Sequence, residues 1–367
     1  MVFIPALWPT GINYRKVGEK PFILEEDFCP RTAHRHGNHT APPLTACEAG
    51  NVGNATPYRA VDRRRMLAAA ALGREVAPLE PAPGDVAPYG TVRGSIIDVS
   101  PHLIVVEDDA GEEHRLVIAP WATAWRGAPI APAELPLRAN VIIRALHGGT
   151  VADRVWADIT RITGTIRSVS GNRDLTIELD CGPHRRPRSV VVPYRATGRI
   201  RVRHPQLEPG YLFDAIGMID EGTTLALLPA TSQPPYRANA VPPPPPAYRG
   251  VQPTISGTAV WGDFEEYGVA YPMLEPGDAG CEDAGVSCTG LPYLSLGSVL
   301  HVLNECDRRG NRLPIVACGC VAGRFCDRCL ECGTSERGRI VELSTTAYVE
   351  LGGELTKGCF NVRVGLG

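Results

Sequence analysis

The sequence predicts a mainly β protein built from several small barrels. Apolar runs of about four to six residues recur along the chain between turns, which is typical of short strands. The 39 glycines and 34 prolines interrupt the chain too often for long helices. A length of 367 residues corresponds to two or three domains. We therefore expect two tandem small antiparallel barrels, a proline-rich linker and a third, C-terminal barrel.

The composition indicates which kinds of partner the protein is not expected to bind. Hydrophobic residues make up 44% of the chain and charged residues 21%, as in ordinary globular proteins. The net charge of −3 provides no broad basic field, so nucleic acid is not an expected partner. No run of 18 apolar residues exists in the sequence, so we expect no membrane span.

Residues 1–84 show no clear periodicity and are expected to form an extended arm with one short helix over 61–75. Met1–Thr10 lacks the basic lead of a secretory signal. Three arginines at 63–65, followed by an alanine-rich stretch, are similar to a twin-arginine export signal. That apolar stretch ends already at Gly73, so we interpret it as the short helix.

Residues 88–231 contain an internal repeat. Gly94 opens the first copy, within 88–162, as Gly-Ser-Ile-Ile-Asp-Val-Ser. Gly164 opens the second copy, within 163–231, as Gly-Thr-Ile-Arg-Ser-Val-Ser. Each copy continues with an apolar strand, an acidic turn containing glycine, a strand ending in Ile-Ala-Pro or Val-Val-Pro, and a further apolar strand.

This order predicts a small antiparallel barrel in each copy, and it resembles the OB-fold. The opening glycine would allow a bulge at which the first strand bends. OB-folds often bind nucleic acid through basic and aromatic residues. Few aromatics are interleaved with the basic residues of the second copy, so we expect a solvated face or a protein contact. These basic residues are Arg185, Arg186, Arg188, Arg195, Arg199, Arg201 and Arg203.

Residues 232–249 are predicted to be a linker. The five prolines at 242–246 favour an extended, stiff conformation. The linker is expected to act as a spacer between two independently folding halves. The alternative is that the proline run is a ligand that a signalling domain binds.

Residues 250–367 again show short strand patterns and one short helix. The predicted strands are Ser256–Trp261, Ser298–Asn304, Leu313–Ala317, Gly338–Ser344 and Asn361–Gly365, with a helix over Thr345–Leu351.

Several segments of this region, taken together, resemble the double-psi β-barrel of the rare lipoprotein A and expansin family. They are Ala-Val-Trp-Gly at 259–262, Leu-Ser-Leu-Gly-Ser-Val-Leu-His-Val-Leu-Asn at 294–304, Gly-Arg-Ile-Val-Glu-Leu-Ser at 338–344, and Leu-Gly at 351–352. The resemblance implies a closed barrel that contacts cell-wall glycan.

The resemblance also indicates where catalysis would lie. Glycan-cleaving members need an acid beside the glycosidic oxygen. The family's Asn-Asp-Arg-Gly-Pro loop is replaced here by Ala-Cys-Gly-Cys at 317–320, and the aspartate of its Ile-Ile-Asp motif is Glu342. The family also has a histidine before its Leu-Pro-x-Gly segment, and that histidine has no counterpart near 289–291 of this sequence. The candidate catalytic pair is therefore Glu342 with Asp263 as its partner. The alternative is that both carboxylates are solvated or cap a structural element.

Cysteines cluster in the same region, since nine of the twelve follow residue 280. Five of them lie within fifteen residues, at Cys318, Cys320, Cys326, Cys329 and Cys332. Their Cys-x-x-Cys spacing suits a zinc site or an iron–sulfur cluster. The alternative is a network of disulfides that also includes Cys281, Cys288, Cys306 and Cys359, as the expansin side of the resemblance implies.

A second set of metal-ligand types occurs in the N-terminal arm, at Cys29, His34, His36, His39 and Cys47. Their spacing matches no zinc module, so polar loop residues are the default interpretation.

The sequence is compatible with three functions. The first is a structural component of a virion or other extracellular assembly, for example a phage tail or tail-tip protein, with a glycan-facing and non-catalytic barrel. The second is a lytic transglycosylase-like or glycan-remodelling enzyme that uses Glu342. The third is a secreted bacterial envelope protein. The expected partners are other subunits of an assembly and peptidoglycan or a surface glycan.

Overall fold

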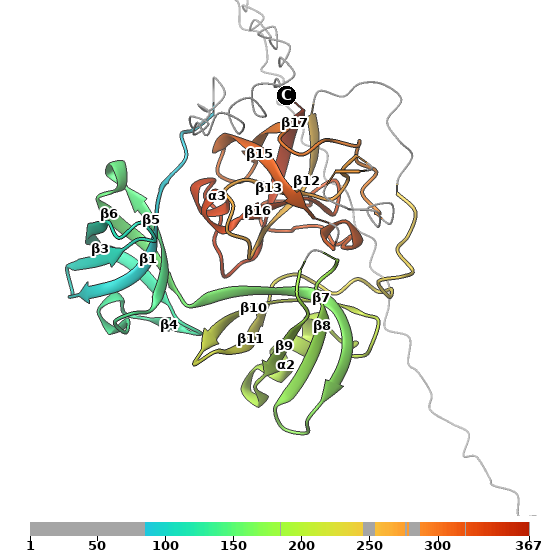
Figure 1. Cartoon of the computed structure of the whole chain (residues 1–367), viewed down its shortest axis with the longest axis horizontal. Coiled ribbons are helices and arrows are strands. Elements are labelled where there is room, and N and C mark those ends of the chain that lie inside the picture. Colours follow the sequence, from blue (N-terminus) through green and yellow to red (C-terminus); the bar gives the residue numbers. More distant parts are fainter. Residues whose placement is uncertain are drawn as a thin grey trace, which may run out of the picture. The chain divides into compact units, whose positions relative to one another are not determined.

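The computed structural model describes residues 85–183, 185–244, 254–275, 277–278, 287–319 and 321–366. The predicted helix at 61–75 and the candidate ligands between Cys29 and Cys47 lie outside the described residues. Within them, the prediction of a mainly β chain with small closed barrels is confirmed (Figure 1). No helix in the described part of the chain is long and apolar enough to cross a membrane.

The first barrel consists of the strands that follow Asp85, with two short 3₁₀ helices, η1 (Pro132–Glu134) and η2 (His147–Gly149). Its strands are β1 (Gly90–Val99), β2 (Leu103–Glu107), β3 (Glu113–Trp125), β4 (Pro129–Ile130), β5 (Asn140–Leu146) and β6 (Val151–Ala157). The sheet has the order β2-β1-β5-β6-β3-β4, and a β2–β3 pairing closes it. Strands β3 and β6 run parallel, and the other neighbours are antiparallel.

The second barrel repeats this connectivity. It is closed in the order β10-β11-β9-β8-β7, and β9 pairs in parallel with β11 as β3 does with β6. A ten-residue helix, α2 (Tyr194–Arg203), lies between β9 and β10 in the chain. The strands are β7 (Ile159–Ser170), β8 (Leu175–Asp180), β9 (Arg188–Val192), β10 (Leu212–Asp220) and β11 (Thr223–Pro229).

The opening glycines serve the same purpose in both copies. Register shifts lie between Ile96 and Asp98 in β1 and between Ile166 and Ser168 in β7, so each copy has a bulge, although it follows the opening glycine at which it was predicted. A Cβ atom on Gly94 would lie 2.1 Å from the carbonyl oxygen of Glu107. The backbones of the paired strands approach so closely there that a side chain does not fit.

Each repeat encloses its own apolar core. Strand alternation sends every second side chain inward, so Ile96, Ile104 and Leu116 fill the first barrel and Ile162 and Ile177 the second. The repeat seen in the sequence is therefore a repeat of structure.

The start of the predicted linker is packed against both neighbouring barrels. The hydroxyl of Tyr236 donates to the carbonyl oxygen of Arg324 at 2.9 Å and accepts from the backbone N–H of Cys326 at 3.1 Å. Ala238 lies in one buried apolar cluster with Leu212 and Phe325. Residues 232–240 thus join the second barrel to the C-terminal region, which differs from the expectation of a simple spacer. Residues 245–249 lie outside the described residues.

The C-terminal barrel is closed in the order β12-β16-β13-β15-β14-β17. Strands β12 and β16 run parallel, as do β13 and β15, and the remaining neighbours are antiparallel. The five predicted strands and the helix are present, whereas the three-residue β13 was not predicted. The elements are β12 (Thr254–Gly262), β13 (Val269–Tyr271), β14 (Val299–Asn304), β15 (Gly310–Cys318), η4 (Ala322–Arg324), β16 (Arg339–Ser344), α3 (Thr345–Glu350) and β17 (Cys359–Leu366).

Candidate functional site

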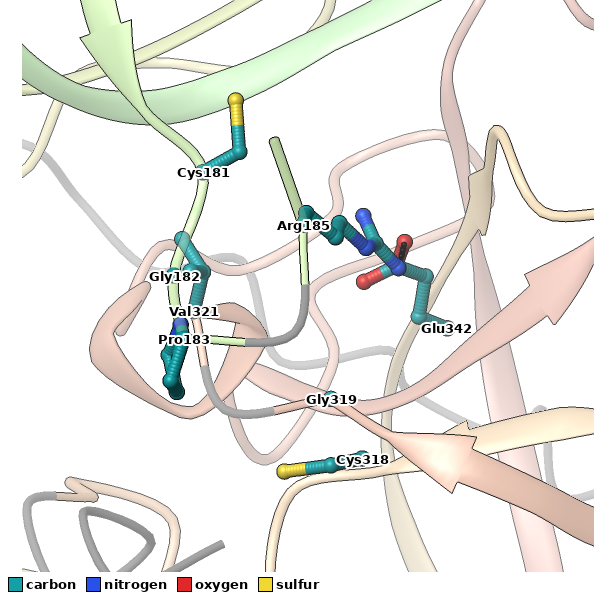
Figure 2. A pocket seen from close by; sticks show the side chains of 8 residues that line it. All are labelled: Cys181, Gly182, Pro183, Arg185, Cys318, Gly319, Val321 and Glu342. Carbon is teal, nitrogen blue, oxygen red and sulfur yellow. Dashed lines mark hydrogen bonds and ion pairs between the residues drawn. The ribbon is translucent and has the colours of Figure 1, made fainter. Parts of the chain in front are cut away.

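Glu342 lies in the middle of β16, where it pairs with Val260 of β12 and Ala270 of β13. Its side chain is buried, and its carboxylate accepts a hydrogen bond from Nη2 of Arg185 at 2.7 Å. Figure 2 shows the two side chains facing each other. Arg185 belongs to the segment between β8 and β9 of the second barrel. The candidate acid is therefore held by a cation from a different barrel.

A glycine makes room for this carboxylate. Gly262 ends β12, and a Cβ atom there would lie 1.9 Å from Oε1 of Glu342. Since real Cβ contacts are never that short, any other residue at 262 would displace the carboxylate from Arg185. The Trp-Gly pair noted in the sequence thus has a local physical role beside Glu342.

The pair of Arg185 and Glu342 is electrostatically coupled. The negative charge of Glu342 raises the pKa of Arg185 above its ordinary value. The guanidinium also lies over the ring of Phe264, 5.9 Å from its centroid. The carboxylate of Glu342 is thus bound by a protein cation, whereas a general acid must contact the substrate directly.

Asp263, the second predicted residue, follows β12 directly. Its Oδ2 atom accepts from Oγ1 of Thr160 at 2.9 Å and from Nη1 of Arg188 at 3.3 Å. Asp263 and Glu342 line one cavity of about 350 Å³, so the structure brings the two predicted residues together. Each carboxylate is bound by an arginine of the second barrel. The remaining lining residues are Arg161, Thr163, Cys181, Arg185, Arg186, Arg188 and Gly262.

The described cysteines of the C-terminal region form disulfides, and Cys281 lies outside the described residues. Cys288 pairs with Cys326, Cys306 with Cys332, and Cys329 with Cys359, with Cα–Cα separations of 5.9, 5.5 and 6.0 Å. These separations fall within the usual range for disulfides.

Cys318 is also disulfide-bonded, and Cys320 lies outside the described residues. A sulfur held in a disulfide is not a thiolate ligand, so the disulfide alternative applies to Cys318, Cys326, Cys329 and Cys332. Among the described residues, Cys181 is a free thiol. Burial raises the pKa of Cys181, which makes this thiol a poor ligand and a poor nucleophile.

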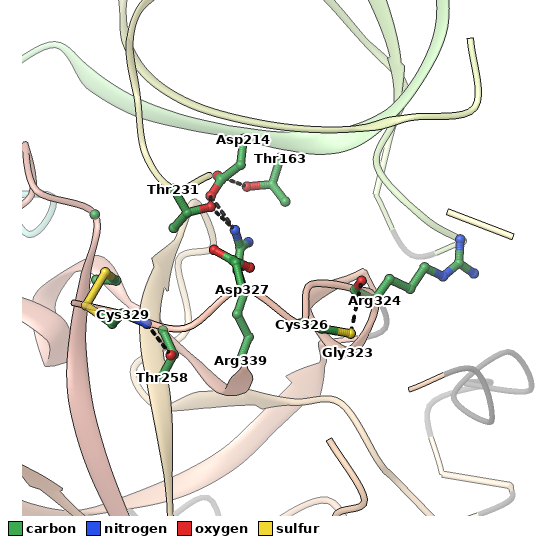
Figure 3. A network of polar contacts seen from close by, with 12 residues as sticks. Thr163, Asp214, Thr231, Thr258, Gly323, Arg324, Cys326, Asp327, Cys329 and Arg339 are labelled. Carbon is green, nitrogen blue, oxygen red and sulfur yellow. Dashed lines mark hydrogen bonds and ion pairs between the residues drawn. A yellow bond between two sulfur atoms is a disulfide. The ribbon is translucent and has the colours of Figure 1, made fainter. Parts of the chain in front are cut away.

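A buried network of charges lies beside the cavity and was not predicted. Asp214 of β10 is fully buried and accepts from Nε and Nη2 of Arg161 at 3.0 and 2.7 Å. It also accepts from Arg339 of β16, and from the hydroxyls of Thr163 and Thr231 at 2.9 and 2.8 Å (Figure 3).

Burial alone would raise the pKa of Asp214, but the two guanidinium groups hold it well below its ordinary value. A second carboxyl, that of the partly buried Asp327, lies 3.8 Å from Nε of Arg339, and desolvation raises its pKa. The network thus crosses from the second barrel to the C-terminal barrel and places two arginines against two aspartates.

A signal for this network existed in the sequence. Arg161, Asp214 and Arg339 are charged residues within otherwise apolar strand patterns. Such residues are buried only when they are paired.

Comparison with known proteins provides no relative from which a function can be transferred: no protein-family model matches the chain, and no curated protein is significantly similar to it. The assignment of function therefore rests on the site itself.

Proposed function

We propose that this chain is a structural component of an extracellular or virion assembly, such as a phage tail or tail-tip protein, whose C-terminal barrel contacts cell-wall glycan without cleaving it. The observation that carries this proposal is the ion pair between Arg185 and Glu342. The family resemblance places the catalytic acid at Glu342, and here that carboxylate is buried and bound by a neighbouring barrel.

The disulfides support a location outside the reducing cytosol. Disulfides persist in oxidising compartments and outside cells. Three of them fix the segment between β15 and β16 to neighbouring parts of the barrel. They also favour a secreted envelope protein over one that completes its assembly in the cytosol. For a virion component, the disulfides would form after release from the cell.

One observation favours an enzyme as the second candidate. Asp263 and Glu342 line the same cavity of about 350 Å³, and two carboxylates across a cleft are what glycoside cleavage requires. On this alternative, a glycan would have to displace Arg185 and Arg188 from the carboxylates before the reaction.

The two candidates are separated by incubating the full chain with purified peptidoglycan sacculi. We expect the protein to sediment with the sacculi and to release no soluble muropeptides. Glu342→Gln should behave identically in both measurements. Release of muropeptides by the wild type, lost in Glu342→Gln and retained in Glu336→Gln, would establish the enzyme. Glu336 is the matched control because its carboxylate is 69% exposed.

A separate experiment addresses the assembly. Material from the native source is fractionated by sedimentation and probed for the chain. Comigration with a large particle supports the proposal, and a freely soluble monomer contradicts it.

A further inference from the structure

Helix α2 presents an unusually basic face. The ten residues of Tyr194–Arg203 include four arginines and no acidic residue, in a chain whose net charge is −3. Arg195 and Arg199 are exposed and lie one turn apart on the same side of the helix. Val202, three residues further, is 79% exposed on that side. Within the described part of the chain, Arg195, Arg199 and Arg201 have no ion-pair partner.

The same two arginines border a cavity with an apolar floor. This cavity has a volume of about 370 Å³, and Arg195 and Arg199 line it together with Met218, Leu225 and Leu227. A nearby cation, Arg126, is already neutralised by Asp158 at 2.8 Å and Asp220 at 3.2 Å. The surface therefore suits an anionic group that has an apolar neighbour.

The first barrel carries an acidic counterpart at the hairpin between β2 and β3. Five of its seven residues are carboxylates: Glu107, Asp108, Asp109, Glu112 and Glu113.

Two of these carboxylates have partners within the hairpin, since His114 lies 2.9 Å from Asp108 and Arg115 lies 3.3 Å from Glu113. Glu107, Asp109 and Glu112 have no ion-pair partner in the described residues. Val117 is 54% exposed on the same face of β3 as Glu113.

We propose that the basic face of α2 in one copy of this chain binds the acidic β2–β3 hairpin of a second copy. The unpaired guanidinium groups of Arg195 and Arg199 meet unpaired carboxylates, and each surface includes one exposed valine. Because the two surfaces differ, the contact is either made twice in a two-fold dimer or repeated head to tail in a ring or a filament. This contact goes beyond the proposed function and does not depend on glycan binding.

The test is a charge exchange measured by sedimentation velocity on the full chain. One variant, Arg195→Glu/Arg199→Glu, reverses both charges on the exposed side of α2. The other, Glu107→Lys/Asp109→Lys/Glu112→Lys, leaves three lysines against two carboxylates and so makes the hairpin basic. All five residues are exposed, so thermal unfolding of both variants should match the wild type. EDTA is present throughout, because Asp108, Glu112 and His114 place their ligand atoms within 4.8 Å of one another and could hold a cation.

We expect the wild type to self-associate at about 0.05 M salt and to dissociate at about 0.5 M, because surface charges are screened as ionic strength rises. Each variant alone should be monomeric, because its two surfaces then repel. An equimolar mixture should associate again, since each variant supplies the partner that the other lacks.

Three results would overturn the proposal. They are a monomeric wild type at low salt, a single variant that associates like the wild type, and a mixture that stays monomeric. A wild type that is monomeric but binds a polyanion such as heparin or RNA through Arg195 and Arg199 would assign α2 to that ligand instead. Glycan binding is measured separately on sacculi, so a failure of one proposal leaves the other standing.

Discussion

Two residues whose pKa values are shifted by desolvation, Glu350 and His204, are expected to titrate with opposite effects on stability. Burial raises the pKa of Glu350 to about 7, although a hydrogen bond from Tyr267 opposes this shift. The folded state therefore keeps a proton that the unfolded chain releases above its ordinary pKa of 4.5, so stability falls as pH rises from about 4.5 to 7. Burial lowers the pKa of His204 to about 4, so stability is lost as pH falls from 6.5 toward 4. The two trends offset each other in the wild type.

Replacing Glu350 by glutamine should separate the two trends. The variant no longer ionises at this position, so we expect it to be more stable than the wild type at pH 8 by about 1–2 kcal/mol. At pH 4 the two proteins should be equally stable, because both side chains are then neutral. Urea unfolding at the two pH values measures this, with the exposed Glu336→Gln as control. An equal change at both pH values would contradict the assignment to ionisation.

The ion pair at the candidate site gives a second prediction for single residues. Arg185→Ala leaves the carboxylate of Glu342 buried without its cation, and we expect a loss of about 1–3 kcal/mol in the free energy of unfolding. Arg186→Ala is the matched control, because the adjacent Arg186 is exposed. In the double variant with Glu342→Gln, the effect of Arg185→Ala should shrink. Additive losses would show that the pair is not coupled.

At the scale of the strands, the bulge glycines set the shape of each barrel. A Cβ atom at Gly94 would overlap a backbone carbonyl at 2.1 Å, and one at Gly164 would approach a carbonyl at 2.7 Å. A Cβ atom at Gly198 of α2 would meet nothing within 4 Å. The backbone of a paired strand has no room to move away, so the crowding has to distort the strand pairing beside each glycine.

The three glycines should therefore respond to alanine in a definite order. Gly94→Ala is expected to destabilise by about 2–3 kcal/mol, Gly164→Ala by less, and Gly198→Ala to stabilise by up to about 1 kcal/mol through helix propensity. Chemical denaturation of the three variants measures this. Equal losses at all three positions would mean that the bulges do not require glycine.

The sequence predicted those features that depend on neighbours along the chain. Strand alternation is local, so Ser298–Asn304 was placed as a strand, and β14 spans Val299–Asn304. The bulges were predictable because a glycine recurred at the same place in both copies. Asp214 meets a partner 53 residues earlier, in Arg161, and another 125 residues later, in Arg339. Such pairings depend on how barrels pack, and no sequence spacing encodes them.

The cysteines show the same limit of prediction from sequence. Their clustering predicted cross-links in the C-terminal region, but it did not decide between a metal site and disulfides, since spacing alone does not define pairing. Cys329 shows why, because it pairs with Cys359 of β17 and not with either cysteine three residues away. The Arg185–Glu342 contact was likewise unpredicted, although Glu342 itself was singled out.

At the scale of the whole molecule, the disulfides of the described residues are concentrated in one barrel. The three pairs with both cysteines described span 26 to 38 residues of sequence, and all lie after residue 287. Closing loops of this size stabilises by roughly 3–4 kcal/mol each. Reduction should therefore lower the hydrogen-exchange protection of the C-terminal barrel far more than that of the first barrel. Hydrogen exchange with and without reductant measures this, and uniform loss of protection across all three barrels would contradict it.

The buried network around Asp214 should determine whether the second and C-terminal barrels unfold together. Asp214→Asn leaves Arg161 and Arg339 buried with one negative charge fewer, and breaking such a network costs about 3–5 kcal/mol. We expect calorimetry to show one cooperative transition in the wild type and two in the variant, because the network connects the two barrels. Asp220→Asn is the control, since that carboxylate is 47% exposed and pairs with Arg126.

A triple replacement then tests what the network contributes. Asp214→Leu with Arg161→Met and Arg339→Met removes Asp214 and both of its cations at once and leaves Asp327, whose pKa burial raises toward the neutral form. Buried ion networks replaced by apolar groups of similar size often retain or gain stability. We expect the triple variant to be at least as stable as Asp214→Asn and to recover a single transition. If Asp214→Asn also unfolds in one transition at an unchanged temperature, the barrels are joined by apolar packing around Phe325 and Leu212, and the charges add only specificity.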